Sequence, residues 1–172
     1  MFSDLDGTLL DHDTYDWRAA APALALLRTR QIPLVLVSSK TLSELQDYRQ
    51  QLQLRHPVVA ENGAAIDIPN GYFDESLGIN APTVGRQLLQ QAYLGAKAEL
   101  GLDASAFFEL GTEGIMDATG LDAHQARRAN ERLASEPILW RDSEEKLEAF
   151  AGAMREKGLQ CVRGGRFVHL MP

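Results

Sequence analysis

The chain has 172 residues, of which 45% are hydrophobic and 24% are charged, and its net charge is -7. This length is enough for one ordinary domain or for a small core with an inserted lid, and the composition is typical of a globular protein in water. The acidic balance argues against a nucleic-acid or membrane surface. Because no run of about 18 apolar residues and no secretion signal is present, we expect a cytoplasmic protein without membrane partners.

Two carboxylates lie one residue apart near the start of the chain, Asp4 and Asp6, and Gly7 and Thr8 follow them. If the residues before Asp4 end a strand, the alternation of side chains puts both carboxylates on the same side, at the carboxyl end of that strand. In an open parallel sheet, ligands bind at that end. Such a pair can hold a divalent cation, attack an electrophile or move a proton, and the residues alone leave these alternatives open.

Apolar patterns after these carboxylates predict an alternation of helices and buried strands. A doubly wound, Rossmann-like parallel sheet with right-handed crossovers is the α/β fold typical of this order. Asp16 is the expected N-cap of the first helix. The expected elements are a helix over Trp17–Arg30, a strand over Ile32–Val37, a helix over Leu42–Leu54, and strands over Pro57–Ala60 and Ala64–Ile68.

The pattern changes after Pro69–Phe73, a stretch rich in residues that break regular structure. We therefore predict two domains, a core over 1–80 and an inserted α+β lid over 81–172, with a small antiparallel sheet that carries helices on one face. The expected lid elements are helices over Thr83–Leu100, Asp122–Ala134 and Ser143–Lys157, a glycine-broken stretch over Gly111–Gly120, a strand over Glu136–Trp140, and a hairpin of Leu159–Val162 with Phe167–Leu170. The single cysteine, Cys161, is interpreted as a buried small residue rather than a nucleophile.

The stretch Asp4-Leu5-Asp6-Gly7-Thr8 resembles the first motif of the haloacid dehalogenase-like phosphatases. The resemblance implies that Asp4 attacks phosphorus to form an aspartyl-phosphate and that Asp6 acts as general acid and base. It also implies that Mg²⁺, held by Asp4 and Asp6, screens the repulsion between the anions. Ser38 matches the family residue that hydrogen-bonds the phosphoryl group, and Ser39 is the alternative if the strand is one residue longer.

Lys40 is a further candidate for phosphate binding because it begins the next helix, where backbone N–H groups favour an anion. The alternative for Lys40 is an ordinary solvated lysine. The turn Glu61–Ala64 is similar to a turn of the lidded subgroup, which implies that Asn62 and Gly63 face the substrate. Asn and Gly also suit a turn that needs positive φ, and the two interpretations are compatible.

Further stretches narrow the resemblance to the mannosyl-3-phosphoglycerate phosphatases of this superfamily. This likeness implies a small sugar-phosphate substrate, hydrolysed with Mg²⁺ to mannosylglycerate. In the lid, Arg166 with the amides of Gly164 and Gly165 is the expected anion-binding loop, and His169 is a candidate sugar contact. A surface hairpin arginine is the alternative for Arg166. The stretches that carry the likeness are Ser38–Thr41, Glu61–Ala64, Thr119–Leu121, Glu136–Trp140 and Gly164–Phe167.

The family pattern also includes a lysine just after the lid and a later acidic loop that completes the metal site, and the 172 residues contain neither. We therefore expect an incomplete core that resumes after residue 172 in a longer form, with one edge and one face of its sheet exposed. Because these ligands are missing, we expect this chain alone to be inactive or barely active, whereas the longer form would hydrolyse the phosphomonoester. Two alternatives remain: a phosphatase of another sugar phosphate, such as sucrose phosphate or a phosphomannose, and an inactive fragment that binds a sugar or a partner.

Overall fold

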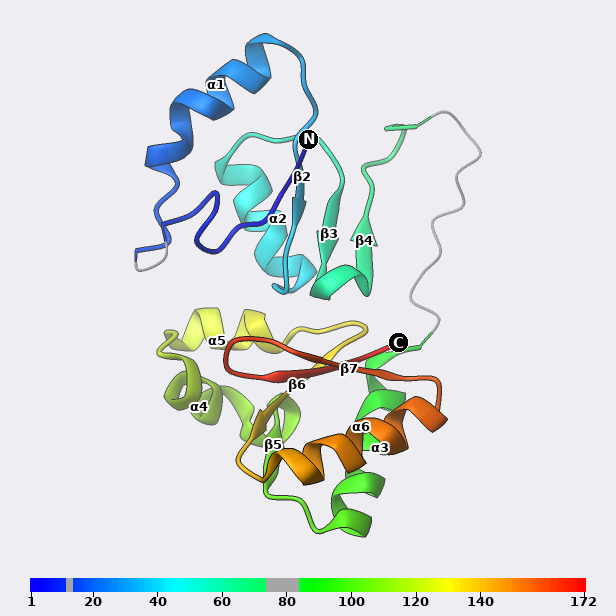
Figure 1. Ribbon diagram of the computed structural model, residues 1–172. Coiled ribbons are helices and arrows are strands. Elements are labelled where there is room, and N and C mark those ends of the chain that lie inside the picture. The colour runs from blue at the N-terminus through cyan, green and yellow to red at the C-terminus, as the bar shows by residue number, and fades with distance from the viewer. Residues whose placement is uncertain (12–13, 74–83) are drawn as a thin grey trace. The chain divides into compact units, whose positions relative to one another are not determined.

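The computed structural model describes residues 1–11, 14–73 and 84–172. The chain divides into two compact units, Met1–Ala81 and Pro82–Pro172, named here unit 1 and unit 2 (Figure 1). The predicted helix start at Thr83 and the predicted boundary between residues 80 and 81 lie outside the described residues. In the part of the chain that the structure describes, no helix has the length and apolar character needed to cross a membrane.

Unit 1 is built on a four-stranded sheet in the order β1-β2-β3-β4. The first three strands are parallel and β4 runs antiparallel to β3, so the predicted parallel α/β order is confirmed and ends in a hairpin. The elements are β1 (Phe2–Ser3), η1 (Arg18–Ala20), α1 (Ala21–Thr29), β2 (Val35–Val37), α2 (Leu42–Gln51), β3 (Val58–Ala60), η2 (Glu61–Gly63) and β4 (Ala65–Asp67).

All five predicted elements of unit 1 are shorter in the structure, and two of the differences have a clear local cause. The strand begins at Val35 rather than Ile32, because Pro33 has no N–H to donate to a neighbouring strand. The predicted helix over Trp17–Arg30 starts as the 3₁₀ turn η1, and Asp16 does not cap α1. Its carboxylate instead accepts a hydrogen bond from the backbone N–H of Arg18.

Side-chain alternation gives the sheet of unit 1 one buried face. Leu36 of β2 is fully buried and packs with Leu24 of α1 and Leu45 of α2. Full burial of one such side chain contributes about 1.5–3 kcal/mol, so these contacts hold the helices on the sheet.

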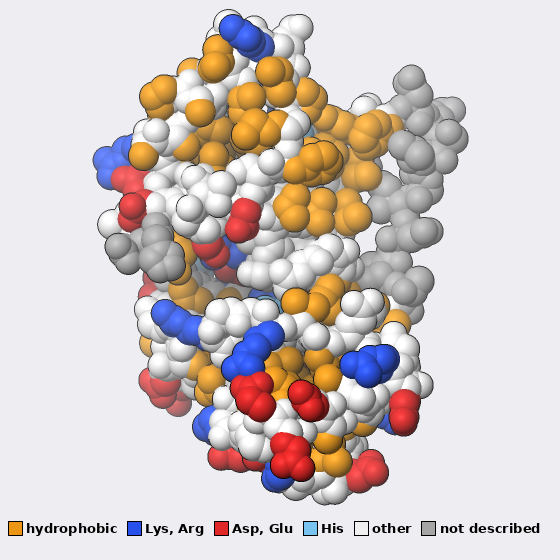
Figure 2. Space-filling view, in the orientation of Figure 1, with side chains coloured by type: hydrophobic (Ala, Val, Ile, Leu, Met, Phe, Trp, Pro, Cys, Tyr) orange, Lys and Arg blue, Asp and Glu red, His pale blue; other side chains and the backbone are white. Residues whose placement is uncertain are grey.

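The opposite face of the same sheet is apolar and exposed in the described residues. The register aligns Phe2 with Val35 and Val59 with Ile66 across the strands. Phe2 and Ile66 are 73% and 48% exposed. Figure 2 shows hydrophobic side chains spread over the visible surface of unit 1.

Unit 2 contains a second four-stranded sheet, in which every pair of strands is antiparallel and the order is β5-β6-β8-β7. Helices α3 and α6 share a core with this sheet, as predicted for an α+β lid. The elements are α3 (Arg86–Leu100), β5 (Ala104–Ala106), α4 (Phe107–Thr119), α5 (Ala123–Asn130), β6 (Glu136–Trp140), α6 (Glu144–Glu156), β7 (Gln160–Arg163) and β8 (Val168–Met171).

The prediction of a glycine-broken stretch over Gly111–Gly120 is wrong in one respect, because most of this stretch is helical. Helix α4 runs through Gly111 with a kink, where φ is 62° and ψ is -170°. Glycine adopts this backbone conformation without a steric penalty, so the helix resumes after the kink. Burial of Ile115 in a cluster with Ala126 of α5 stabilises the resumed part.

A buried ion pair joins several elements of unit 2. The Glu136 side chain is fully buried, and the Arg86 guanidinium donates to both of its oxygens, at 2.7 and 3.2 Å. Gln90 and the backbone N–H of Phe108 also donate to Glu136. Arg86 in turn donates to the carbonyl and side-chain oxygens of Asn130. This network ties α3, α4 and α5 to β6.

Replacing Arg86 with Met (R86M) is expected to destabilise unit 2 by about 3 kcal/mol, because a buried carboxylate then lacks its cation. Urea unfolding followed by Trp140 fluorescence in a W17F background measures this loss. The matched control is R163M, which breaks the ion pair with Glu144, whose two side chains are 65% and 67% exposed. A change below about 1 kcal/mol is expected there. Equal losses in the two variants would contradict the assigned role of the buried pair.

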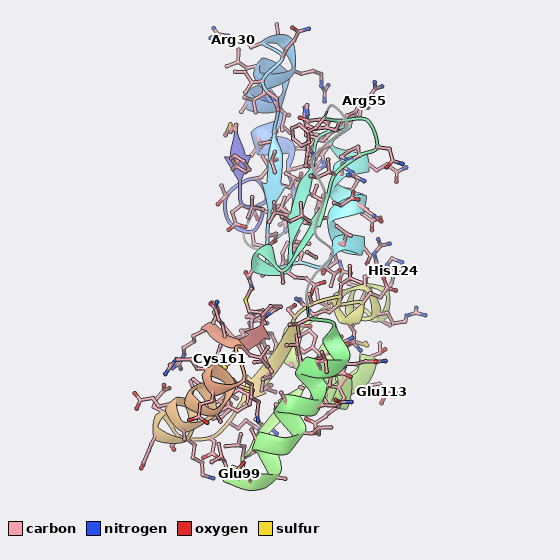
Figure 3. The ribbon with its side chains drawn as sticks, turned by 90° about the vertical axis from the view of Figure 1, so that its right-hand side faces the viewer. Arg30, Arg55, Glu99, Glu113, His124 and Cys161 are labelled. Atoms are coloured by element: carbon pink, nitrogen blue, oxygen red, sulfur yellow. The ribbon has the colours of Figure 1, made fainter. Side chains whose placement is uncertain are left out.

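Cys161 lies on β7 and is half-buried, less covered than the sequence interpretation assumed (Figure 3). Burial raises the pKa of its thiol to about 11. The thiolate is the reactive form, so a rise of about two pKa units predicts alkylation by iodoacetamide at pH 8 about a hundredfold slower than for an unperturbed cysteine. The rate in urea serves as the unfolded reference. Equal rates with and without urea would show that the fold does not protect this thiol.

Candidate active site

A hollow of about 590 Å³ lies in unit 1 where three strands end. Asp4 follows β1, Ser38 follows β2 and Glu61 follows β3. The carboxyl ends of parallel strands meet at one edge of a sheet, which is where ligands bind in open α/β folds. The lining residues are Phe2, Ser3, Asp4, Asp6, Val37, Ser38, Ser39 and Asn62.

Asp4 and Asp6 both face this hollow because the residue between them points away from it. Leu5 is fully buried in the core of unit 1, whereas both aspartates are exposed. The Asp4 carboxylate accepts a hydrogen bond from the backbone N–H of Leu5 at 2.7 Å. The Leu5 carbonyl accepts from the backbone N–H groups of Thr8, Leu9 and Leu10, which folds the chain back directly after the two carboxylates.

Lys40 lies beside Asp6 rather than in open solvent. Its Nζ is 3.2 Å from Oδ2 of Asp6, and only 15% of its side chain is exposed. Burial by itself lowers the pKa of Lys40, but the carboxylates of Asp6 and Glu44 outweigh that effect and the pKa is raised. Lys40 therefore carries its positive charge at neutral pH.

The start of α2 fixes the backbone at Lys40. Thr41 and Glu44 form a capping box, in which the backbone N–H of Glu44 donates to Oγ1 of Thr41 and that of Thr41 donates to the Glu44 carboxylate. Both interactions satisfy N–H groups that a helix start leaves without partners. The buried Ser38 hydroxyl accepts from the backbone N–H of Lys40 at 3.2 Å.

The turn after β3 is held by the loop after β2. The backbone N–H of Asn62 donates to the Ser38 carbonyl, and that of Glu61 donates to the Lys40 carbonyl. Glu61, Asn62 and Gly63 have φ values of 53°, 59° and 98°, in the left-handed region. Asn62 lines the hollow, and Gly63 lies in the same turn. The turn therefore has the positive φ values that Asn and Gly suit, and it also lies beside the hollow.

The carboxylates of this hollow fit a Mg²⁺ ion. Asp4 and Asp6 offer hard oxygen ligands, although one oxygen of Asp6 already faces Lys40. Mg²⁺ keeps several waters and commonly takes one or two carboxylates together with substrate phosphate. Within the described ranges, no group of three or more His, Cys, Asp or Glu residues is arranged to hold a metal.

The other four candidate residues belong to the β7–β8 hairpin of unit 2. Gly164, Gly165 and Arg166 are exposed at its tip, where the Arg166 guanidinium donates to the Thr119 carbonyl at 2.9 Å. His169 is buried on β8, and a Cβ on Gly164 would lie 3.0 Å from its Nε2. The absence of a side chain at Gly164 therefore makes room for the imidazole.

His169 is held in its neutral form. Burial, together with the charge of Arg132, lowers its pKa to about 4. Its Nδ1 is buried and has no hydrogen-bond partner among the described residues. Because this nitrogen has no accessible surface, a ligand contact of His169 would have to use the rest of the imidazole.

Two contacts were not predicted from the sequence. The ring of Tyr15 lies under Lys40, with 5.1 Å between Nζ and the ring centroid. An aromatic residue in the loop after the paired aspartates is a weak signal that could have indicated this contact. Arg132, which influences His169, lies just after α5 and packs over the Phe107 ring. Nothing in its sequence neighbourhood distinguishes it from a solvated arginine.

Comparisons with known proteins identify relatives of both units. A glucosyl-3-phosphoglycerate/mannosyl-3-phosphoglycerate phosphatase of Methanococcoides burtonii is 35% identical over 99% of this chain. Among solved structures, a haloacid dehalogenase-like hydrolase from Bacteroides thetaiotaomicron aligns with a TM-score of 0.65 at 16% identity. Thermoplasma acidophilum 0175 aligns with a TM-score of 0.62 at 16% identity. Each of these two structures aligns with 99% of this chain.

The chain spans 66% of the length of the Methanococcoides phosphatase, 70% of the Bacteroides chain and 62% of the Thermoplasma chain. Residues 1–87 match the profile of the haloacid dehalogenase-like hydrolases, and this stretch contains the paired aspartates and the hollow beside them. The chain belongs to the haloacid dehalogenase-like hydrolase family.

Proposed function

We propose that this protein is a Mg²⁺-dependent phosphatase that hydrolyses mannosyl-3-phosphoglycerate to mannosylglycerate. The observation that carries the proposal is the meeting of Asp4, Asp6 and Ser38 in one hollow, with the Lys40 ammonium against Asp6. The 35% identical relative is named as a phosphatase of the glucosyl and mannosyl esters, which supports this substrate class. The substrate is a small cytoplasmic metabolite, and no nucleic acid or membrane takes part.

In the first proposed step, the Asp4 carboxylate attacks the phosphorus atom. A bond forms between an Asp4 oxygen and phosphorus, and the bond from phosphorus to the substrate oxygen breaks. Asp6, which begins the cycle protonated, donates its proton to the departing oxygen and becomes a carboxylate, so the sugar product leaves as a neutral alcohol and Asp4 carries the phosphoryl group.

In the second step, Asp6 acts as a base. It takes a proton from a water molecule, whose oxygen attacks phosphorus while the bond to Asp4 breaks. Phosphate leaves, the Asp4 carboxylate is regenerated and Asp6 is again protonated, so the cycle is balanced in atoms and charge.

Ser38 and Lys40 are the proposed binders of the phosphoryl group. The Ser38 hydroxyl, which accepts from the Lys40 backbone, retains its own hydrogen to donate to a phosphoryl oxygen. The Lys40 ammonium offers a positive charge that an incoming phosphate shares with Asp6. Ser39 and Asn62 complete the polar lining, with Gly63 in the same turn. Mg²⁺, when bound, would be held by the Asp4 carboxylate and an oxygen of Asp6, and it would neutralise charge between the Asp4 carboxylate and the phosphate.

Unit 2 is the proposed source of specificity for the rest of the substrate. The exposed loop of Gly164, Gly165 and Arg166 offers backbone amides and a guanidinium to the glycerate carboxylate. His169, whose Nδ1 is buried and whose Nε2 lies beside Gly164, is the proposed sugar contact. In this proposal residues 1–80 form the core and residues 81–172 the lid.

The variant D4N is expected to lose phosphate release from mannosyl-3-phosphoglycerate by at least about a thousandfold, because an amide cannot replace the nucleophile. Single-turnover release with Mg²⁺ measures the effect, and mass spectrometry of the peptide with Asp4 detects the phosphoryl adduct in the unaltered chain. D16N is the matched control, since the Asp16 carboxylate pairs with Arg18. Release retained in D4N would contradict Asp4 as the nucleophile.

The variant K40M keeps the length of the side chain and removes its charge. We expect kcat/KM to fall about tenfold to a hundredfold, the usual cost of losing a hydrogen bond to a charged group. K40R, which keeps a cation beside Asp6, should recover most of the loss. An unchanged kcat/KM in K40M would show that Lys40 is only a structural partner of Asp6.

A calorimetric titration separates turnover from binding alone. Mannosylglycerate and inorganic phosphate are titrated separately into the chain, and phosphate release is followed in parallel with the mannosyl and glucosyl substrates. Binding of mannosylglycerate without release of phosphate would support the binding-fragment alternative over the phosphatase. That the 172-residue chain alone is inactive or barely active stays a prediction, which the release assay tests directly.

A further inference from the structure

A second hollow lies in unit 1, at the opposite end of the sheet from the candidate active site. It has a volume of about 620 Å³, within the usual range of about 300–1,000 Å³ for small-molecule sites. Leu34, directly before β2, lines it, whereas Ser38, directly after β2, lines the first hollow. At about 3.3 Å per residue, the strand separates these two residues by about 13 Å, so the hollows are distinct.

The lining of the second hollow combines an apolar surface with positively charged side chains. The apolar part comes from α1, from Leu34 and from the segment after α2. Of the described residues that line it, none is acidic, although the whole chain carries a net charge of -7. The lining residues are Leu24, Leu27, Arg28, Ile32, Leu34, Arg49, Gln50, Gln53, Leu54, Arg55 and His56.

The concentration of arginine here is high for this unit. Three of its six cationic side chains line the second hollow, the six being Arg18, Arg28, Arg30, Lys40, Arg49 and Arg55. Like charges repel when they are brought together, so any cation of this cluster that lacks a carboxylate partner has an unmet attraction for an anion.

The three arginines of the second hollow differ in the hydrogen bonds and ion pairs that their guanidinium groups already make. Arg49 is paired with Asp67, 2.7 Å away. Arg28 donates one hydrogen bond, 3.3 Å long, from Nη2 to the Leu52 carbonyl and keeps further N–H groups. Arg55 is exposed, and no hydrogen bond or ion pair of its guanidinium is found with any residue in the described ranges. Arg28 and Arg55 therefore have donors available for a ligand.

His56 has a position that suits the same ligand. Its Nδ1 lies 2.9 Å from the Tyr72 hydroxyl, and the two rings meet edge to face at 5.7 Å between centroids. This contact fixes the orientation of the imidazole and leaves Nε2 for a further polar contact.

We propose that the second hollow binds a small molecule that carries a phosphate group on an apolar body. Guanidinium groups match phosphate oxygens with paired donors, and two available arginines suit a doubly charged anion better than a carboxylate. The leucine and isoleucine side chains contact the apolar body and exclude water around it. The site is separate from the proposed phosphatase chemistry and does not depend on it.

The test is a calorimetric titration of the 172-residue chain with phenylphosphonate, which joins a doubly charged group to an apolar ring and cannot be hydrolysed as an ester. We expect binding that R55Q weakens about tenfold or more, because a hydrogen bond from a charged group is lost. R55E should abolish binding, because it places a negative charge beside the anion. Arg55 is exposed, so neither variant should alter folding, which circular dichroism checks.

R30Q is the matched control for R55Q. Arg30 is also an exposed arginine, it lies at the same end of unit 1, and it does not line the hollow (Figure 3). R30Q should leave the affinity unchanged. Equal weakening by R30Q and R55Q would show that the anion is attracted only by general surface charge, which overturns the proposal.

Three further titrations define the ligand and its place. Inorganic phosphate and phenylacetate should each bind more weakly than phenylphosphonate, because the first lacks the apolar body and the second has a single charge. Equal affinity for either would overturn the proposed ligand class. K40Q should retain the phenylphosphonate binding that R55Q weakens, because Lys40 lies beside Asp6 at the first hollow. Loss of binding in K40Q with retention in R55Q would place the anion in the first hollow and refute the second site.

Discussion

The parallel pairing of β1, β2 and β3 is the constraint on which the candidate site depends. Phe2 aligns with Val35 and Leu36 with Val58, so all three strands end at the same edge. Asp4, Ser38 and Asn62 reach one hollow only because their strands end together. A shift of register by one residue would move each side chain to the opposite face of the sheet and separate these groups. Burial of Leu5 and Leu36 opposes such a shift.

Backbone hydrogen bonds between loops then refine what the strands bring together. The carbonyls of Ser38 and Lys40 both accept N–H groups from the turn after β3, whose non-glycine residues hold positive φ. Such conformations cost of order 1–3 kcal/mol each and persist where surrounding contacts compensate for them. Their concentration beside Asp4 and Asp6 is consistent with a site whose geometry is held before any ligand arrives.

Charge is distributed differently in the two units. In unit 1, Lys40 and the arginines of the second hollow lie at opposite ends of the sheet, so positive charge marks both hollows of an otherwise acidic chain. In unit 2, the buried Arg86–Glu136 pair has a structural place, joining helices to the sheet with all its partners satisfied internally. The exposed Arg166 donates a hydrogen bond to the Thr119 carbonyl and keeps further donors for other partners.

Local patterns in the sequence were enough to predict that Asp4 and Asp6 share one side of a strand end, that the first three strands are parallel and that the sheet of unit 2 is antiparallel. The spacing of residues and the length of apolar runs are local properties of a sequence. Strand and helix ends were less predictable: Pro33 shortened β2, and burial of Ile115 favoured a helix that the glycines of α4 had argued against.

Only the tertiary structure decided that Lys40 lies against Asp6 and the Tyr15 ring, and that His169 is neutral beneath Gly164. The second hollow could not be predicted either, since Arg28 and Arg55 are 27 positions apart and line one hollow only when α1 and the segment after α2 pack on the same sheet. Contacts between distant positions depend on packing, and no local pattern records them.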